Sequence, residues 1–220
     1  MMLPRGVSFF QDARQWIGGV RFDVIFDVGA NVGQSAHVFA EENPQAQIYC
    51  FEPVARAHEE LRRNVAHLPR VKTYKLAMGS YNHSQMIHVP QESSLASFEQ
   101  FTGETTDERV DVATVDEFSA TFGIALIDLL KIDTEGHDVD VLQGAFRMLT
   151  GRVNFVQVEA SFCEGNKRFI ALDRFVDLLG FGYEIFGIYD QMAHPTGRPS
   201  IAYMNAVFVN STLLKEPPWR

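Results

Sequence analysis

The sequence predicts an α/β protein, a three-layer sandwich around a mostly parallel sheet of about seven strands. Strand-like and helix-like segments alternate with short connections through the first part of the chain, which favours a doubly wound sheet. Several strands are near-continuous apolar runs, typical of strands buried on both faces. The last two strand-like runs are joined by a connection too short for a helical crossover. The last strand is therefore expected to run antiparallel to its neighbour.

The amino-terminal part of the chain has the clearest alternation of elements. Glycine and proline mark where its helices end, at Gly18-Gly19 and at Pro44. Pro53 suits the first turn of a helix, because the N–H that it lacks would have no helical partner there. In chain order we expect a helix at 7–17, a strand at 22–30, a helix at 33–43, a strand at 46–53, a helix at 54–65 and a strand at 71–78.

A long polar stretch separates this part from the rest. The stretch from Pro90 to Asp107 has no clear period, and we interpret it as a surface loop and a candidate lid. Gly151 and Gly180 are expected to end two later helices. The further expected strands are 84–89, 108–115, 127–133, 153–160, 183–189 and 202–209. The further expected helices are 115–123, then 138–149 burying Val139, Leu142, Phe146 and Leu149, and one burying Phe169, Leu172, Phe175, Val176 and Leu179.

Length and composition indicate a single globular domain. The 220 residues are 46% hydrophobic and 21% charged, with a net charge of −9 and no cluster of Lys and Arg. We expect an N-terminal helical segment at 1–20 and one domain at 21–220. The charge disfavours nucleic acid and anionic membranes as partners. Without a signal-like or membrane-length apolar run, a cytoplasmic protein is expected. Cys50 and Cys163 have no metal-like spacing and are expected to be reduced core thiols.

A ligand is expected beyond the carboxyl ends of the parallel strands. The first strand ends in "DVGANVG", a glycine turn whose spacing is not the dinucleotide fingerprint, so that a pyrophosphate site is disfavoured. Alone, such a turn is equally well explained as the closure of a βα unit. Glu52 ends the second strand, where an acid can accept hydrogen bonds from ribose hydroxyls. Its alternative role is to offset the dipole of the following helix. Turn and acid together favour an adenosine-type ligand.

The most distinctive stretch is "LLKIDTEGHDVDVLQGA", in which a buried strand leads through several charged residues into a helix. Together with "DVGANVGQS", "FEP" and "VQVE", in this order over Phe22 to Val209, it resembles the FkbM family of S-adenosylmethionine-dependent methyltransferases. The resemblance implies a class I methyltransferase (Rossmann-like) fold for 21–220. It also implies methyl transfer to a hydroxyl of a small-molecule acceptor such as a sugar, a polyketide or another secondary metabolite.

The resemblance also implies which residues bind the cofactor. Glu52 would bind the ribose, and Ala77 and Met78 would line the adenine, although Met78 is equally well explained as a core side chain. The methionine half of S-adenosylmethionine would be held by Asp27, Gly29, Ala30, Asn31 and Gly33.

Methyl transfer to a hydroxyl needs a group that removes its proton, either a base or a metal that lowers the hydroxyl pKa. Asp133 ends the fourth parallel strand and Glu159 the fifth, so these acids are expected to be neighbours. They are candidates for base and orienting group, or for shared ligands of Mg²⁺. Glu135 and His137 would join Asp133 if the corner stays extended, but Gly136 predicts a bend there.

Other charged residues near this corner have simpler interpretations. Asp138 and Asp140 are expected to offset the dipole of the helix that begins there. Lys131 is expected to extend its amine to a carboxylate and to fix Asp133 or Glu159. His194 lies in a loop on the ligand side and is a weaker candidate for acceptor binding.

Three other functions compete with methyl transfer. The first is a metal-dependent hydrolase built on Asp133, Glu135, His137 and Glu159. The second is an NAD-dependent oxidoreductase, which the glycine spacing disfavours. The third is a binding module that retains the cofactor pocket without transferring a methyl group.

Overall fold

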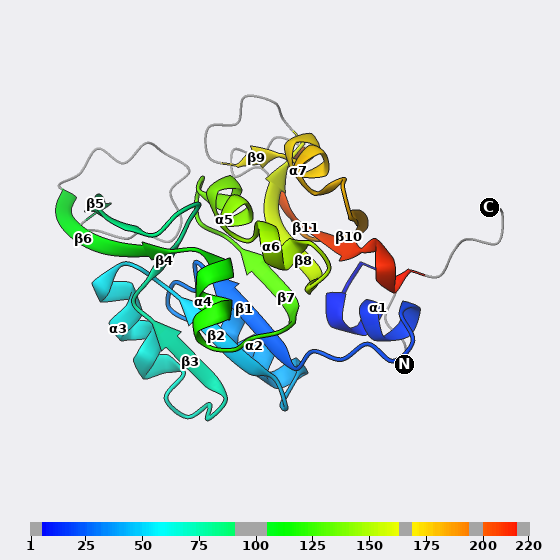
Figure 1. The fold of residues 1–220 in the computed structure, drawn as a ribbon, viewed down its shortest axis with the longest axis horizontal. Coiled ribbons are helices and arrows are strands. Elements are labelled where there is room, and N and C mark those ends of the chain that lie inside the picture. Colours follow the sequence, from blue (N-terminus) through cyan, green and yellow to red (C-terminus); the bar gives the residue numbers. More distant parts are fainter. Residues whose placement is uncertain (1–5, 91–104, 163–168, 194–199, 215–220) are drawn as a thin grey trace.

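The computed structural model describes residues 6–90, 105–162, 169–193 and 200–214 of the chain. Its main sheet lies between helices on both faces, as Figure 1 shows. The spatial order of its strands is β10 (Tyr183–Ala193), β11 (Ile201–Asn210), β8 (Val153–Ser161), β7 (Ile127–Ile132), β1 (Val24–Val28), β2 (Gln47–Phe51) and β3 (Val71–Tyr74), with the short β9 (Ile170–Ala171) paired to β8. The predicted α/β sandwich is confirmed.

The last strand is reversed, as the sequence predicts. β11 runs antiparallel to both of its neighbours, β10 and β8, whereas β8, β7, β1, β2 and β3 are parallel. The carboxyl ends of β1, β2, β7 and β8 therefore meet at one edge of the sheet, here called the carboxyl edge.

The two faces of the sheet bury separate apolar clusters. One face packs against α1 (Phe9–Trp16), α2 (Gln34–Glu42) and α3 (Ala55–Asn64). The other packs against α4 (Val115–Thr121), α5 (Asp138–Gly144), α6 (Phe146–Leu149) and α7 (Leu172–Leu179). A short 3₁₀ helix, Ser211–Leu213, follows β11. No helix in the described ranges is long and apolar enough to cross a membrane.

The strand predicted at 71–78 is two strands. β3 ends at Tyr74, and β4 (Ala77–Met78) joins a second, three-stranded sheet with β6 (Thr105–Ala113) and β5 (His83–Pro90). The reason lies in the neighbouring strand. Glu52 donates the last ladder hydrogen bond from its N–H to the Tyr74 carbonyl, and the next N–H on the same side of the strand, that of Val54, donates to the Glu52 carboxylate instead. Ala77 and Met78 pair with Val112 and Ala113 instead.

Two predicted helix faces are wrong in part. The helix predicted at 138–149 breaks at Ala145, and Phe146 is 61% exposed. Its buried stripe is Val141, Leu142, Ala145, Met148 and Leu149. Both stripes repeat with helical spacing, so periodicity alone could not choose between them. In α7, Phe175 and Leu179 are buried as predicted, but Val176 is 40% exposed.

Some predictions fall outside the described residues. Cys50 is a buried free thiol on β2, but Cys163 is not described. The same holds for His194 and for residues 91–104 of the candidate lid. The ends of that predicted loop belong to β5 and β6, where His88 pairs with Asp107.

Candidate active site

The glycine turn after β1 is held against two other strand ends. The N–H groups of Gly29 and Ala30 both donate to the Phe51 carbonyl, at 3.0 and 3.1 Å. Gly29 has φ +76°, and a Cβ atom there would overlap the backbone carbonyl of Asp133. Glycine is therefore required by the close approach of Asp133, in addition to the turn itself. The turn and the Asp133 corner are in direct backbone contact.

Glu52 joins the end of β2 to this turn. Its Oε2 accepts the N–H of Asn31 at 3.0 Å, and its Oε1 accepts the N–H of Val54 at 2.9 Å. The side chain is 7% exposed, and burial raises the pKa of its carboxyl group while the two amides oppose that rise. Asn31 has φ +47°, which asparagine tolerates better than most residues. Turn and acid thus form one hydrogen-bonded unit.

The remaining predicted cofactor residues lie in different environments. Gly33, at φ +98°, precedes α2, and a Cβ there would press on Leu61 and Val65 of the α3 region. Met78 is 4% exposed and belongs to the core on the α4 to α7 side. Ala77 is partly buried beside it. The core explanation of Met78 therefore accounts for its position.

Asp27 lies beneath the glycine turn and is fully buried. Its Oδ1 is 3.0 Å from the Nζ of Lys131, while its Oδ2 has no hydrogen-bond donor among the described residues. The same ammonium lies 3.3 Å from Asp133 Oδ2 and donates to the Gly29 carbonyl at 3.3 Å. The two carboxylates keep the lysine protonated, because they raise its pKa more than burial lowers it. Asp27 thus faces Lys131 inside the protein.

Asp133 and Glu159 are neighbours, as their positions at the ends of β7 and β8 predict. Burial, the charge of Asp133 and a hydrogen bond with its side chain raise the pKa of Glu159 to about 8, while Lys131 acts in the opposite direction. Glu159 therefore favours its protonated form at neutral pH. Asp133 and Glu159 together are here called the acid pair.

The extended Asp-x-Glu-x-His corner that would bring Glu135 and His137 to the side of Asp133 is not formed, and the bend that Gly136 predicts is present. Glu135 at φ +51° and Gly136 at φ +112° turn the backbone through the left-handed region and break the alternation. Both Glu135 and His137 are exposed, and His137 Nδ1 pairs with Asp140 at 3.4 Å. In the part of the chain that the structure describes, no three His, Cys, Asp or Glu side chains form a metal site.

Two further polar residues lie near the acid pair. Asp138 is 4% exposed, and its Oδ1 accepts the N–H of Thr134 at 3.2 Å, so it braces the corner as well as beginning α5. Asn205 of β11 lies opposite Glu159 in the sheet, and its amide donates to Asp190 at 2.8 Å. Asn205 is a polar residue inside the apolar run "AYMNAVFV", and this signal in the sequence could have identified it as a residue of the site.

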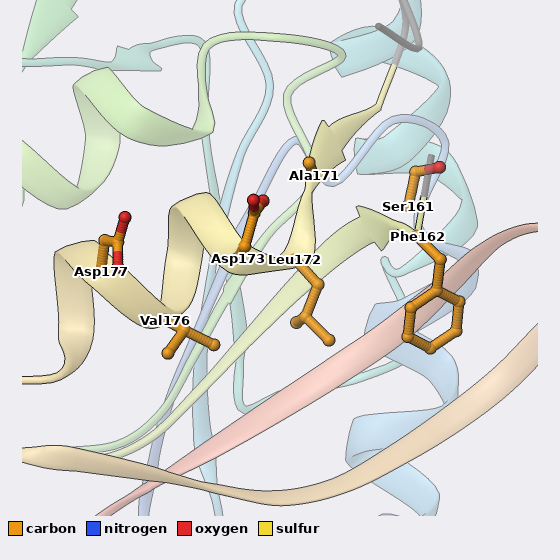
Figure 2. Close-up of a pocket in the computed structure, with 7 residues that line it drawn as sticks. All are labelled: Ser161, Phe162, Ala171, Leu172, Asp173, Val176 and Asp177. Atoms are coloured by element: carbon orange, nitrogen blue, oxygen red, sulfur yellow. The ribbon is translucent and has the colours of Figure 1, made fainter. Parts of the chain in front are cut away.

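A cavity of about 420 Å³ opens beside the end of β8 and the start of α7. Figure 2 shows the carboxylates of Asp173 and Asp177 pointing to one side of α7, and Leu172 and Val176 pointing to the other. Phe162, 54% exposed, forms the wall across from the helix. The cavity combines carboxylate and apolar surfaces and begins two residues after Glu159.

Known proteins resemble this chain in sequence. The model of the methyltransferase FkbM domain matches residues 27–185. The 2-O-methyltransferase NoeI of Sinorhizobium fredii is 27% identical over 172 residues, which are 71% of this chain and 70% of that protein. The hexuronic acid methyltransferase AglP of Haloferax volcanii is 27% identical over 137 residues, 62% of this chain and 55% of that protein.

Solved structures share the fold. An FkbM methyltransferase from Methylobacillus flagellatus superposes with a TM-score of 0.55 at 18% identity, over 86% of this chain but only 45% of its own. A protein from Clostridium thermocellum named as a putative rRNA methylase superposes with a TM-score of 0.53 at 8% identity, over 94% of this chain and 98% of its own. At these identities the likeness concerns the fold, which is that of the class I methyltransferases.

Proposed function

This chain belongs to the FkbM family of S-adenosylmethionine-dependent methyltransferases, and we propose that it methylates a hydroxyl oxygen of a small-molecule acceptor. Membership in this family replaces the hydrolase and the NAD-dependent oxidoreductase as explanations of the site. The observation that carries the oxygen-directed proposal is the acid pair, because transfer to a hydroxyl requires a group that takes up its proton.

The residues around the glycine turn suit the cofactor. S-adenosylmethionine supplies an activated methyl group when it is bound. Gly29, Ala30, Asn31 and Gly33 would hold its methionine half, with Asp27 beneath them. Each Glu52 oxygen accepts one backbone N–H and keeps a second lone pair, so the carboxylate is able to accept ribose hydroxyls as well.

The acid pair would take up the proton of the acceptor. Once Glu159 has lost its proton it regains one readily, because burial and the charge of Asp133 both favour its protonated form. A group that accepts a proton near the working pH is the most effective base. We assign the proton to the pair as a unit, since coupled acids titrate together.

The acceptor class is proposed from three observations. The names of two relatives describe methylation at a 2-oxygen and on a hexuronic acid. The cavity beside β8 presents carboxylates and apolar side chains, a combination that suits the hydroxyl groups and C–H surface of a sugar. The net charge of −9 argues against RNA.

The proposal is tested by labelled methyl transfer. The protein is incubated with methyl-labelled S-adenosylmethionine and a panel of neutral sugars, hexuronic acids, hydroxylated secondary metabolites, amines and RNA, and the products are analysed by mass spectrometry. We expect label in a methyl ether of a small hydroxyl compound. Label confined to amines or to RNA would contradict the proposal.

The pH dependence gives a second test. We expect kcat/KM to rise with pH through about 8, where the acid pair loses its proton, and Glu159→Gln to remove that rise. Folding also raises the pKa of Glu159 above its ordinary value of 4.5, so the folded state retains a proton that the unfolded chain loses. The free energy of unfolding should therefore fall as the pH rises from about 4.5 to about 8, and it should fall less in Glu159→Gln. An unchanged rate profile in Glu159→Gln would remove Glu159 from the proton path.

A further inference from the structure

Lys131 is a buried cation at the centre of the main sheet. It lies on β7, every residue of which is buried, and it is itself 5% exposed. Its ammonium group has three N–H donors and meets three acceptors, Asp27 Oδ1, Asp133 Oδ2 and the Gly29 carbonyl, at 3.0, 3.3 and 3.3 Å. The contact with the Gly29 carbonyl is a hydrogen bond, and the contacts with the two carboxylates are ion pairs.

The three acceptors belong to both halves of the site. Asp27 and Gly29 come from β1 and its glycine turn, whereas Asp133 follows β7 and belongs to the acid pair. One ammonium group thus connects the turn that would hold the cofactor with the acid that would take part in proton transfer. The backbone contact between Gly29 and the Asp133 carbonyl links the same two parts of the site.

We propose that Lys131 is a positioning residue, which fixes the Asp133 carboxylate and the Gly29 turn relative to each other. This inference rests on the proposed function, because it takes Asp133 as part of the acid pair. The alternative is that Lys131 only neutralises the buried charge of Asp27. Buried ion pairs add little stability compared with apolar residues of the same size, so stability alone does not account for this arrangement.

Lys131 also decides the charge balance around the acid pair. The groups that act on Glu159 are Asp133 and Lys131 of the β7 segment and Asp138 of α5, and Lys131 is the one cation among them. Asp27 of β1 acts on Lys131 from the other side. Without Lys131 these acids face one another unopposed, and the pair retains its proton to higher pH.

The central experiment uses Lys131→Met and Lys131→Arg in the full chain. S-adenosylhomocysteine affinity is measured by calorimetry, which needs no acceptor, and the pH profile of kcat/KM is measured with the acceptor found in the screen. For Lys131→Met we expect about tenfold weaker S-adenosylhomocysteine binding and a rise in rate displaced upward by about one pH unit. Arginine keeps the charge but not the three contacts of a single nitrogen, so we expect a profile near that of the wild type with about tenfold lower kcat.

A double variant separates positioning from charge neutralisation. Lys131→Met alone leaves Asp27 buried without its cation and is expected to lower the melting temperature. Asp27→Asn with Lys131→Met removes both charges. We expect it to recover stability while cofactor-product binding stays weak and the pH profile stays displaced. If the double variant recovers wild-type affinity and profile, Lys131 is only a counter-ion and the proposal fails.

One control variant completes the test. Lys72→Met removes an exposed lysine of β3, whose Nζ lies 5.4 Å from the Tyr49 ring centre, and should change neither affinity nor profile. Unchanged calorimetry and an unchanged profile in a folded Lys131→Met variant would overturn the inference. A wild-type protein that binds S-adenosylhomocysteine but methylates no hydroxyl would overturn the proposed function instead, and the calorimetry would still report on the link between Lys131 and the turn.

Discussion

Strand β7 has an aspartate at each end, and the protein uses the two in opposite ways. Asp128, near the amino end, is surrounded by neutral donors: its Oδ2 accepts the N–H groups of Asp23 and Val24 at 2.8 and 2.9 Å, and its Oδ1 accepts the Asn154 amide at 2.8 Å. Asp133, just past the carboxyl end, faces Lys131 and another acid.

The difference separates a structural acid from a reactive one. Burial raises the pKa of Asp128, but its three hydrogen bonds stabilise the charged form, and no second carboxyl group shares its proton among those contacts. Asp133 is partly exposed and hydrogen-bonded to Glu159, whose proton is lost near pH 8. Neutral donors hold a carboxylate in one state, whereas a cation on one side and an acid on the other let the site exchange a proton.

The largest expected effect is on turnover in Asp133→Asn. The amide cannot take up a proton and weakens the contact with Lys131, so we expect kcat to fall by about a hundredfold or more. The dissociation constant of S-adenosylhomocysteine should change by less than about threefold, since Glu52 and the turn remain. Steady-state kinetics and calorimetry measure the two quantities. Full turnover would place Asp133 with Asp128 as a structural acid.

The matching change at the amino end is Asp128→Ala. It leaves the N–H groups of Asp23 and Val24 and the Asn154 amide without this acceptor, so we expect the free energy of unfolding to fall by about 2 kcal/mol or more. Urea denaturation measures the loss. Activity per folded molecule should be that of the wild type, and a drop in kcat without a loss of stability would break the comparison.

Glu52→Ala sharpens the comparison because Glu52 shares features of both acids. It accepts two backbone N–H groups, as Asp128 does, yet it ends a strand at the carboxyl edge. We expect the dissociation constant of S-adenosylhomocysteine to rise by about tenfold, with a smaller loss of stability than in Asp128→Ala. If calorimetry finds unchanged affinity, Glu52 only supports the turn.

The smallest effect is expected for His137→Ala. This side chain is exposed and its one ion pair, with Asp140, lies at the surface, where such pairs contribute little. We expect kcat/KM and the melting temperature to change by less than about twofold and about 2 °C, respectively. A large loss of activity would show that the corner rearranges around the acceptor and that exposure is a poor guide to function there.

Short sequence patterns predicted the strands and the residues at their ends. The apolar runs, the glycine turn, Glu52 and the Asp133 corner are patterns within a few residues, and parallel strands bring their carboxyl ends together whatever their order in the chain. The buried face predicted for the helix at 138–149 was wrong in part. Two stripes of apolar residues there have the same helical period, and only packing against the sheet decides which stripe is buried. The split of the strand at 71–78 depended on the end of the neighbouring strand, where the N–H of Val54 donates to the Glu52 side chain and leaves the ladder.

By itself the sequence determined the alternating α/β fold, the reversed last strand, the glycine turn, the acid after β2 and the acids after β7 and β8, because each follows from spacing or from strand order. Only the tertiary structure decided that Glu135 and His137 are exposed, that Asp133 raises the pKa of Glu159, and that Lys131 bridges both halves of the site. Lys131 and Gly29 are 102 positions apart in the chain. Their contact exists because β1 and β7 are neighbours in the sheet, and side-chain charges acquire their partners only when such strands pack together.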